Sequence, residues 1–328
     1  MSAAEWILAA IAPAAIAWAT IFLLSRTRLA SRLADRPNER SLHDVPTPRI
    51  GGLGLMAGAM PLAFAFATTE LAVVLGVALF LCALSLADDA QSLPVPVRLA
   101  GHAVAAAIVV ATLADGGEPA PGLAVESIVA LLAIVWMTNL FNFMDGADGL
   151  AGGMAAIGFG ALAIAGATAG QFALAAVAVA IASASIGFLA HNFPPARVFM
   201  GDAGSVPLGF LAGALGYVGW KNGSWPLFFP VVAFAPFIAD ATVTLGRRIA
   251  RGEPFWEAHR THAYQRLVLR GWSRRRLAGA AYALMLASAA AALAALPAGA
   301  SLRSGILLCT AAMYLLLFIA IELRVRAP

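Results

Sequence analysis

Residues 172–191 read FALAAVAVAIASASIGFLAH, a run that holds no Asp, Glu, Lys or Arg. A helix of about 20 apolar residues crosses the roughly 30 Å hydrocarbon core of a bilayer, so this stretch predicts a membrane span. The whole chain has the same character, because 61% of its 328 residues are hydrophobic, 12% are charged and the mean hydropathy is +0.86. Comparable windows occur near residues 5–25, 51–69, 71–87, 97–114, 122–140, 150–168, 205–221, 226–245, 277–297 and 302–322. We therefore expect an all-α polytopic integral membrane protein with about eleven transmembrane helices.

The basic residues indicate which way these helices face. All but two of the 21 lysines and arginines fall on segments that alternate to the same side of the membrane, and the exceptions are Lys221 and Arg303. The positive-inside rule places those segments in the cytoplasm, with a periplasmic N-terminus and a cytoplasmic C-terminus. The formal net charge of +4 then suits membrane lipid headgroups, and we expect no nucleic-acid partner. Residues 1–328 are expected to form a single transmembrane domain.

The polar clusters of the sequence all fall in loops assigned to the cytoplasm. These loops lie near residues 26–50, 88–97, 141–149, 192–204 and 246–276. Hydropathy alone does not require this agreement, since it counts spans without regard to where acids and histidines occur. We therefore expect the five loops to form one active site.

Five aspartates in these loops predict a site for a cation and a phosphate. Asp88 and Asp89 end the third window, where the negative end of a helix disfavours two carboxylates unless a cation compensates. Asp145 and Asp148, spaced i,i+3, and Asp202 each precede a helix whose positive end and free N–H groups face the loop. Oxygen ligands favour Mg²⁺, with Mn²⁺ as a substitute, and no His/Cys set has zinc spacing. Ordinary helix caps are the alternative explanation.

A basic loop follows the ninth window. His259, His262 and Arg266 lie there among further arginines, on a segment long enough to fold over a site and suited to a nucleotide diphosphate. Binding of lipid headgroups is the alternative. Asp240 lies inside the ninth window itself, where an ionisable group is costly. A structural arginine partner and a catalytic role both remain open for Asp240.

Two segments carry a family resemblance, NFMDGADGL at 142–150 and FMGDAGS at 199–205. Together with Asp88-Asp89 and the order of the loops, they resemble the polyprenyl-phosphate N-acetylhexosamine-1-phosphate transferase superfamily. The resemblance implies magnesium-dependent attack of undecaprenyl phosphate on the β-phosphorus of a UDP-N-acetylhexosamine, with release of UMP. It also implies a bacterial inner-membrane enzyme with its site on the cytoplasmic face, and leaves a homodimer open.

The resemblance also implies roles for individual residues. Asp88, Asp89, Asp202 and His259 would be catalytic. Asp202 would be the principal metal ligand, and Asp88 or Asp89 would serve as a further metal ligand or engage the lipid phosphate. Phe199 would stack on the uracil ring. The other expected substrate contacts are His43, Arg49, Asn142, Asp145, Asp148, His262 and Arg266.

Three questions of function remain open at this stage. The segment from Pro46 to Arg49 and the broken histidine run from His259 to His262 look like the O-antigen-initiating branch, whereas a phospho-MurNAc-pentapeptide transferase is the alternative within the superfamily. A cation-coupled transporter is the rival class, although its site should lie near the bilayer midplane. No motif encodes the identity of the N-acetylhexosamine or the glycan pathway.

Overall fold

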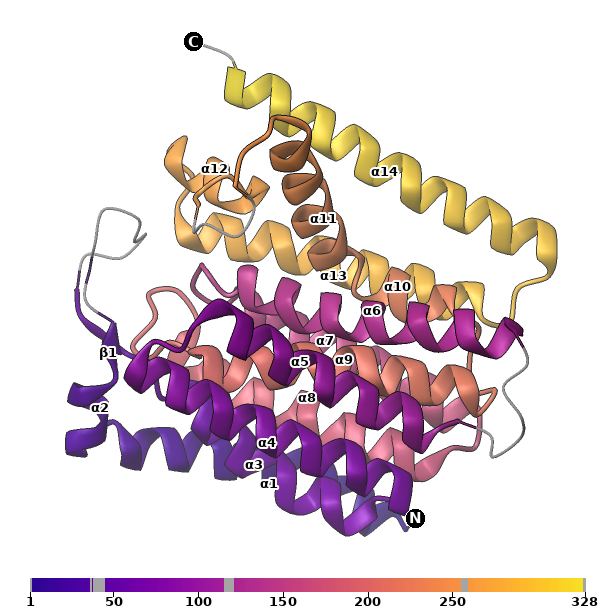
Figure 1. Cartoon of the computed structure of the whole chain (residues 1–328), viewed down its shortest axis with the longest axis horizontal. Helices are drawn as coiled ribbons and strands as arrows, with labels where there is room; N and C mark the ends of the chain where they lie inside the picture. The colour runs from indigo at the N-terminus through magenta and orange to yellow at the C-terminus, as the bar shows by residue number, and fades with distance from the viewer. Residues whose placement is uncertain (1, 36, 38–44, 115–120, 255–258, 327–328) are drawn as a thin grey trace.

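The computed structural model describes residues 2–35, 37, 45–114, 121–254 and 259–326, and the chain is almost entirely helical there (Figure 1). Two strands, β1 (Ala34–Asp35) and β2 (Thr47–Pro48), form a short antiparallel pair. The helices are α1 (Ala3–Leu24), α2 (Arg28–Arg32), α3 (Gly51–Phe66), α4 (Thr69–Gln91), α5 (Val95–Thr112), α6 (Pro121–Phe143), α7 (Leu150–Thr168), α8 (Phe172–Asn192), α9 (Asp202–Lys221), α10 (Phe228–Ala233), α11 (Ala235–Ala250), α12 (Ala263–Leu269), α13 (Arg274–Ala295) and α14 (Ala300–Arg326).

The all-α polytopic fold is confirmed, and every predicted window contains a helix. Eight helices among the described residues are long and apolar enough to cross a membrane, while α3 is a shorter apolar helix. The window at 226–245 is divided, because α10 ends at Ala233 and α11 begins at Ala235. Pro236 explains the break, since proline lacks a backbone N–H and disfavours helical geometry in the residue before it. The count of eleven spans and the orientation of the termini stay predictions.

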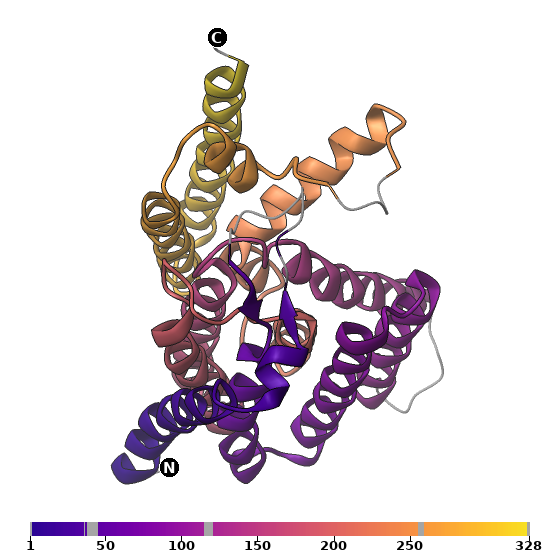
Figure 2. The same cartoon turned by 90° about the vertical axis from the view of Figure 1, so that its left-hand side faces the viewer.

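The long helices run roughly side by side, and the two ends of the chain lie at opposite ends of the bundle (Figure 1). The strands, α2 and α12 gather toward the end that Figure 2 shows face-on. An odd number of spans requires this separation of the termini. Which of the two ends faces the cytoplasm stays a prediction.

Small residues allow α1 and α8 to pack closely. The Ser183 hydroxyl donates to the Ala10 carbonyl at 2.6 Å and accepts from the Ala14 N–H at 3.1 Å. A Cβ added to Gly187 would collide with the backbone carbonyl of Ala14. Close backbone approach of this kind replaces the hydrophobic driving force that helices lack inside a bilayer.

The predicted sidedness can be tested by thiol labelling. Ser273 begins α13 at the end of the bundle that carries α12, whereas Ala169 follows α7 at the opposite end. In a Cys309→Ser background, a membrane-impermeant thiol reagent should label Ala169→Cys in intact cells. Ser273→Cys should react only after the membrane is permeabilised. The reverse pattern would invert the topology.

The glycine contact between α1 and α8 predicts a stability difference. Gly187→Ala should destabilise the protein by about 1–3 kcal/mol, because the added methyl group overpacks a backbone contact. Gly160→Ala in α7 is the matched control, since its Cβ would have no atom within 4 Å. Thermal unfolding of both variants in the same detergent should lower the midpoint for Gly187→Ala alone. Equal midpoints would contradict the packing argument.

Candidate active site

The segment before α3 and the segment before α9 are joined by backbone hydrogen bonds. The Phe199 N–H donates to the Pro48 carbonyl at 2.8 Å, and the Gly51 N–H donates to the Phe199 carbonyl at 2.9 Å. A third bond runs from the Gly52 N–H to the Met200 carbonyl at 2.8 Å. We call the bonded segment from Phe199 to Met200 the strap, and Phe199 is half-buried on it. The pairing places the starts of α3 and α9 beside each other at one end of the bundle.

Three of the predicted aspartates gather at the start of α9. Asp89 accepts a hydrogen bond from the Ala203 N–H at 3.4 Å, and Arg49 Nη1 lies 3.7 Å from Asp89 Oδ1. Burial, then the negative charges of Asp202 and Asp89, raise the pKa of Asp145 well above its ordinary value, while Arg49 opposes the shift. Three carboxyl groups therefore lie close to Arg49, and their repulsion and burial favour either protonation or a bound cation.

Arg49 and Asn142 fix this aspartate cluster from two sides. Arg49 Nη2 also contacts Asp35 Oδ1 at 2.8 Å, which ties β1 to the cluster. The Asn142 side chain hydrogen-bonds Asp202 and donates to the Ser205 hydroxyl at 3.1 Å. These bonds orient Asp202 at the first position of α9, where the positive end of the helix favours an anion.

Asp88 has different partners from Asp89, as adjacent positions on a continuous helix predict. Asp88 Oδ1 accepts from the Leu93 N–H at 2.6 Å, and Asp88 Oδ2 forms an ion pair with Arg98 Nη1 at 3.0 Å. The turn is closed by Ser92, which adopts φ 53°. The cation that compensates Asp88 is thus Arg98 of the same chain.

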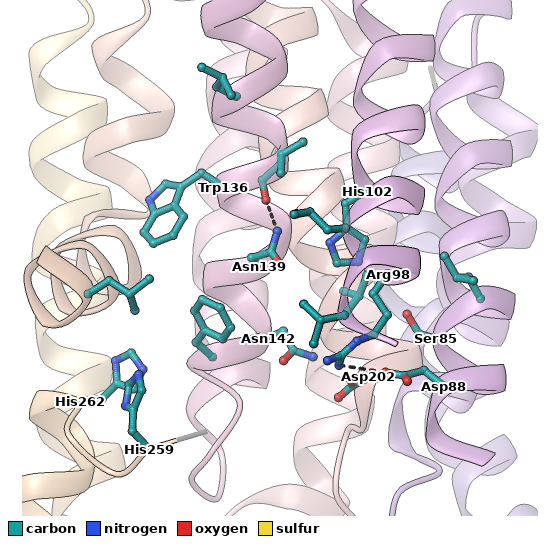
Figure 3. A pocket seen from close by; sticks show the side chains of 18 of the residues that line it. Ser85, Asp88, Arg98, His102, Trp136, Asn139, Asn142, Asp202, His259 and His262 are labelled. Atoms are coloured by element: carbon teal, nitrogen blue, oxygen red, sulfur yellow. Dashed lines mark hydrogen bonds and ion pairs between the residues drawn. The ribbon is translucent and has the colours of Figure 1, made fainter. Parts of the chain in front are cut away.

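A cavity of about 700 Å³ extends from this cluster along α5 and α6 (Figure 3). Asp88, Arg98 and Asp202 lie on one side of it, and His259 and His262 lie on the other. Its deeper walls are largely apolar and are lined by Leu84, Val95, Leu99, Leu132, Val135 and Trp136. The cavity therefore has a charged part, which we call its mouth, lined by Asp88, Arg98 and Asp202. This part continues into an apolar passage lined by the residues just listed.

Three buried nitrogen atoms of residues that line the cavity have no hydrogen-bond partner among the residues that the structure describes. They are Arg98 Nε, His102 Nδ1 and His262 Nδ1. Unpartnered buried polar atoms are costly, so these side chains favour a neighbouring ligand that carries hydrogen-bonding oxygens, or water. A phosphate group has that chemistry, and Arg98 supplies a positive charge beside it.

Asp240 anchors the loop between α11 and α12. Its carboxylate accepts from the Ala263 N–H at 2.9 Å and from the Tyr264 N–H at 3.2 Å, so it caps the start of α12. It also lies 3.4 Å from His262 Nδ1. The partner of Asp240 is thus a helix start and a histidine, rather than the arginine considered from the sequence.

His262 and His259 are adjacent in space, with ring centroids 5.0 Å apart. Thr261 Oγ1 lies 3.0 Å from His259 Nδ1. Burial, followed by the nearby His262 and Arg248, lowers the pKa of His259 to about 4. His259 is therefore a neutral imidazole at pH 7 in the free protein, able to donate and accept a hydrogen bond.

Three residues that the sequence predicted for the site are not placed there by the structure. Asp148 accepts from the Ala196 N–H at 3.0 Å and lies 3.5 Å from Arg274 Nη1, so it fixes the turn before Phe199. Arg266 pairs with Glu322 at 2.8 Å. Neither Asp148 nor Arg266 is among the described side chains that line the cavity. His43 lies outside the described residues.

Sequence reasoning gave no site role to several residues that shape the cavity. Arg98 entered only as a basic residue in a topology count, although it is the one cation close to Asp88-Asp89 along the chain. His102 lies one helical turn later and also received no site role from the sequence. Asn192 is buried and joins the Gly149 N–H to the Val198 carbonyl, with bonds of 2.8 and 2.9 Å. Spacing along α5 could have identified Arg98 and His102, but nothing local identifies the partners of Asn192.

The donor set fits a magnesium ion that is shared with phosphate oxygens. No group of three His, Cys, Asp or Glu side chains in the described part of the chain forms a metal site by itself. Magnesium usually takes one or two protein carboxylates and completes its shell with phosphate oxygens and water. Asp202, with Asp89 and Asp145 beside it, provides the carboxylates and an excess of negative charge.

Comparison with known proteins identifies the family. The model of glycosyl transferase family 4 matches residues 71–219, from α4 to the end of α9. The decaprenyl-phosphate N-acetylglucosaminephosphotransferase of Mycobacterium tuberculosis is 30% identical over 300 residues, which cover 76% of this chain and 72% of the relative. The chain belongs to glycosyl transferase family 4. It is therefore an enzyme, and the matched segment carries the aspartate cluster.

Two further relatives differ in how much of the chain they match. The probable undecaprenyl-phosphate N-acetylglucosaminyl 1-phosphate transferase of Bacillus subtilis is 29% identical over 267 residues, covering 77% of this chain and 74% of the relative. The phospho-N-acetylmuramoyl-pentapeptide-transferase of Geobacillus kaustophilus is 36% identical over 157 residues, covering only 46% and 45%. Similarity to the N-acetylglucosamine enzymes thus extends over more of the family 4 chain.

The lowered pKa of His259 predicts a pH dependence of stability. The unfolded chain binds a proton on this residue near the ordinary value of 6.5, whereas the folded protein binds it only near 4. The contribution of His259 to the free energy of unfolding is therefore complete above pH 6.5 and is lost as the pH falls toward 4. Between pH 7 and 5, the unfolding midpoint of the wild type should fall more than that of His259→Gln. Parallel curves would contradict the burial of the neutral imidazole.

Proposed function

We propose that this family 4 enzyme transfers N-acetylglucosamine 1-phosphate from UDP-N-acetylglucosamine to undecaprenyl phosphate or a similar polyprenyl phosphate. UMP would be the other product. The main support is the single cavity, in which a charged mouth lined by Asp202 leads into an apolar passage. The names of the M. tuberculosis and B. subtilis relatives support the polyprenyl acceptor and the N-acetylglucosamine donor. The site would face the cytoplasm at the bacterial inner membrane.

The acceptor phosphate is proposed to bind beside Arg98. Arg98 and His102 line the cavity, and Asp88 holds the Arg98 guanidinium in place at 3.0 Å. The isoprenoid chain would continue along the apolar wall formed by Leu99 and Leu132. Asp88 would thus act on the lipid phosphate through Arg98.

The donor is proposed to bind between the aspartate cluster and the last loop. Phe199 is held half-buried on the strap beside the cluster, where its ring could stack on uracil. Asn142 reaches the same region and also lines the cavity. His259 and His262 border the opposite wall, from which their ring nitrogens can donate to diphosphate or sugar oxygens.

Asp202 and Asp89, with Asp145 nearby, would hold the magnesium ion, and a bound ion would neutralise charge on the diphosphate. In the proposed reaction an oxygen of the lipid phosphate forms a bond to the β-phosphorus of the donor. The bond between that phosphorus and the bridging oxygen breaks, and UMP leaves with the electron pair. Asn142 and Ala203 contribute by fixing Asp202 and Asp89 in position.

A phospho-MurNAc-pentapeptide transferase is the second candidate function. The G. kaustophilus relative supports it, but over less than half of either chain. The interrupted histidine run around Thr261 also favours the N-acetylglucosamine donor. We therefore rank the muramyl donor second.

The proposed reaction can be tested with purified enzyme, undecaprenyl phosphate and magnesium. UDP-N-acetylglucosamine should give UMP and a lipid-linked sugar diphosphate, and excess UMP should regenerate the donor, because one phosphoanhydride replaces another. UDP-MurNAc-pentapeptide in place of UDP-N-acetylglucosamine should give little UMP. Release of UDP would mean glycosyl transfer and would contradict the proposal.

The aspartate cluster predicts a large loss of activity for Asp202→Asn. This change keeps the shape of the side chain but removes an anionic ligand, so turnover should fall about a thousandfold or more. Asp148→Asn is the matched control, because that residue contacts Ala196 and Arg274 outside the cavity. Its loss should be smaller and accompanied by lower thermal stability. Near-normal turnover of Asp202→Asn would remove this residue from the mechanism.

The proposed acceptor site predicts a selective effect of Arg98→Gln. The KM for the lipid phosphate should rise about tenfold or more, because a charge-assisted contact is lost. Binding of UDP, measured by calorimetry with magnesium, should change little. An unchanged KM for the lipid phosphate, or a loss confined to UDP binding, would place the acceptor elsewhere.

A further inference from the structure

The last helix of the chain carries a single acid, Glu322, near the end of the bundle where the site lies. Its Oε2 atom accepts from Arg266 Nη1 at 2.8 Å and from Arg247 Nη1 at 3.2 Å. The Glu322 side chain is 21% exposed. One carboxylate of α14 thus bridges arginines from α11 and α12.

Apart from this contact, much of α14 is peripheral. Leu308, Leu315 and Leu316 are each more than 60% exposed, and Figure 1 shows the helix along the edge of the bundle. A carboxylate on an apolar helix of this kind is costly unless it is paired. The bridge therefore indicates a specific role for Glu322 rather than general packing.

The start of α12 is held by two sets of contacts, one made by Asp240 and the other by Glu322, which together we call the frame. On one side, Asp240 of α11 caps α12 and contacts His262. Arg247 lies seven residues after Asp240, about two turns along the same face of α11, and Arg266 lies four residues after His262 on α12. Two arginines that repel each other occupy the second side, and Glu322 bridges them and reduces their repulsion. Glu322 thus adds a second connection between α11 and α12.

We propose that Glu322 is a positioning residue through which α14 holds α12, and with it His262 and His259, against the donor side of the cavity. The inference rests on the proposed function, since it assigns the donor to that side. Arg266, expected from the sequence to bind substrate, acts in this frame as the connection from α12 to α14. The acceptor side at Arg98 is independent of the frame.

The test compares Glu322→Gln, which removes the charge, with Glu322→Asp, which retains it. Glu322→Gln should raise the donor KM and the dissociation constant for UDP about tenfold or more, with little change in the KM for the lipid phosphate. Glu322→Asp should recover most of the donor affinity. Should Glu322→Gln not be obtained in folded form, Arg247→Gln removes one of the two bonds and should give a smaller change of the same kind.

Glu126→Gln is the matched control. Glu126 also belongs to a membrane helix and pairs with Lys221 at 3.1 Å, but it lies outside the cavity lining. Its loss should reduce thermal stability while leaving the donor KM unchanged.

Equal donor affinity in Glu322→Gln and wild type, or equal increases in both KM values, would contradict the inference. UDP binding is measured without the acceptor, so it does not depend on the transfer reaction. If the wild type binds UDP but releases no UMP, only the proposed function is overturned. The UDP affinity of Glu322→Gln then still tests the inference.

Discussion

The close contact between Gly52 and Gly204 brings the first turns of α3 and α9 together, and the site depends on it. A Cβ on Gly52 would overlap the backbone of Gly204, so a larger residue at this position would separate the two helices. The strap from Phe199 to Met200 is fixed by backbone bonds to the start of α3. The chain thereby joins the segment before α3 to the start of α9.

This arrangement concentrates negative charge that the protein compensates only in part. Asp88 has Arg98 as a full partner at 3.0 Å, whereas Asp89, Asp145 and Asp202 share the more distant Arg49. Carboxylates in such surroundings repel one another and lose hydration, so a divalent cation and a diphosphate together would relieve both costs. This difference between the two groups supports the proposed separation of an acceptor side at Arg98 from a donor side at Asp202. Enzymes that transfer phosphoryl groups rely on this kind of prearranged charge.

Local patterns in the sequence predicted most of the fold, because each apolar run encodes its own helix. Adjacent positions on one continuous helix point in different directions, which explains why Asp88 and Asp89 have different partners. The break between α10 and α11 was missed, although Pro236 marks it. Hydropathy windows average over several residues and do not register the loss of one backbone donor.

Long-range partners could not be predicted in the same way. The Arg266–Glu322 pair spans 56 positions, and the bond between Ala203 and Asp89 spans 114. No local periodicity specifies such contacts, because they depend on which helices become neighbours after folding. Arg266 therefore resembled a substrate-binding residue in the sequence, and Asp240 gave no sign that it caps α12. Gathering of Asp89, Asp145 and Asp202 was anticipated only because their loops were assigned to one side of the membrane.

The central claim is that the aspartate cluster and the donor diphosphate hold one divalent cation between them. Electron paramagnetic resonance of Mn²⁺ tests it most directly, with purified wild type and Asp202→Asn titrated in the presence and absence of UDP. The account predicts tight Mn²⁺ binding to the wild type only when UDP is present, with the Mn²⁺ signal broadened by ¹⁷O placed in the β-phosphate, and no such binding to Asp202→Asn. Equal Mn²⁺ binding by both proteins, or binding that does not depend on UDP, would contradict it.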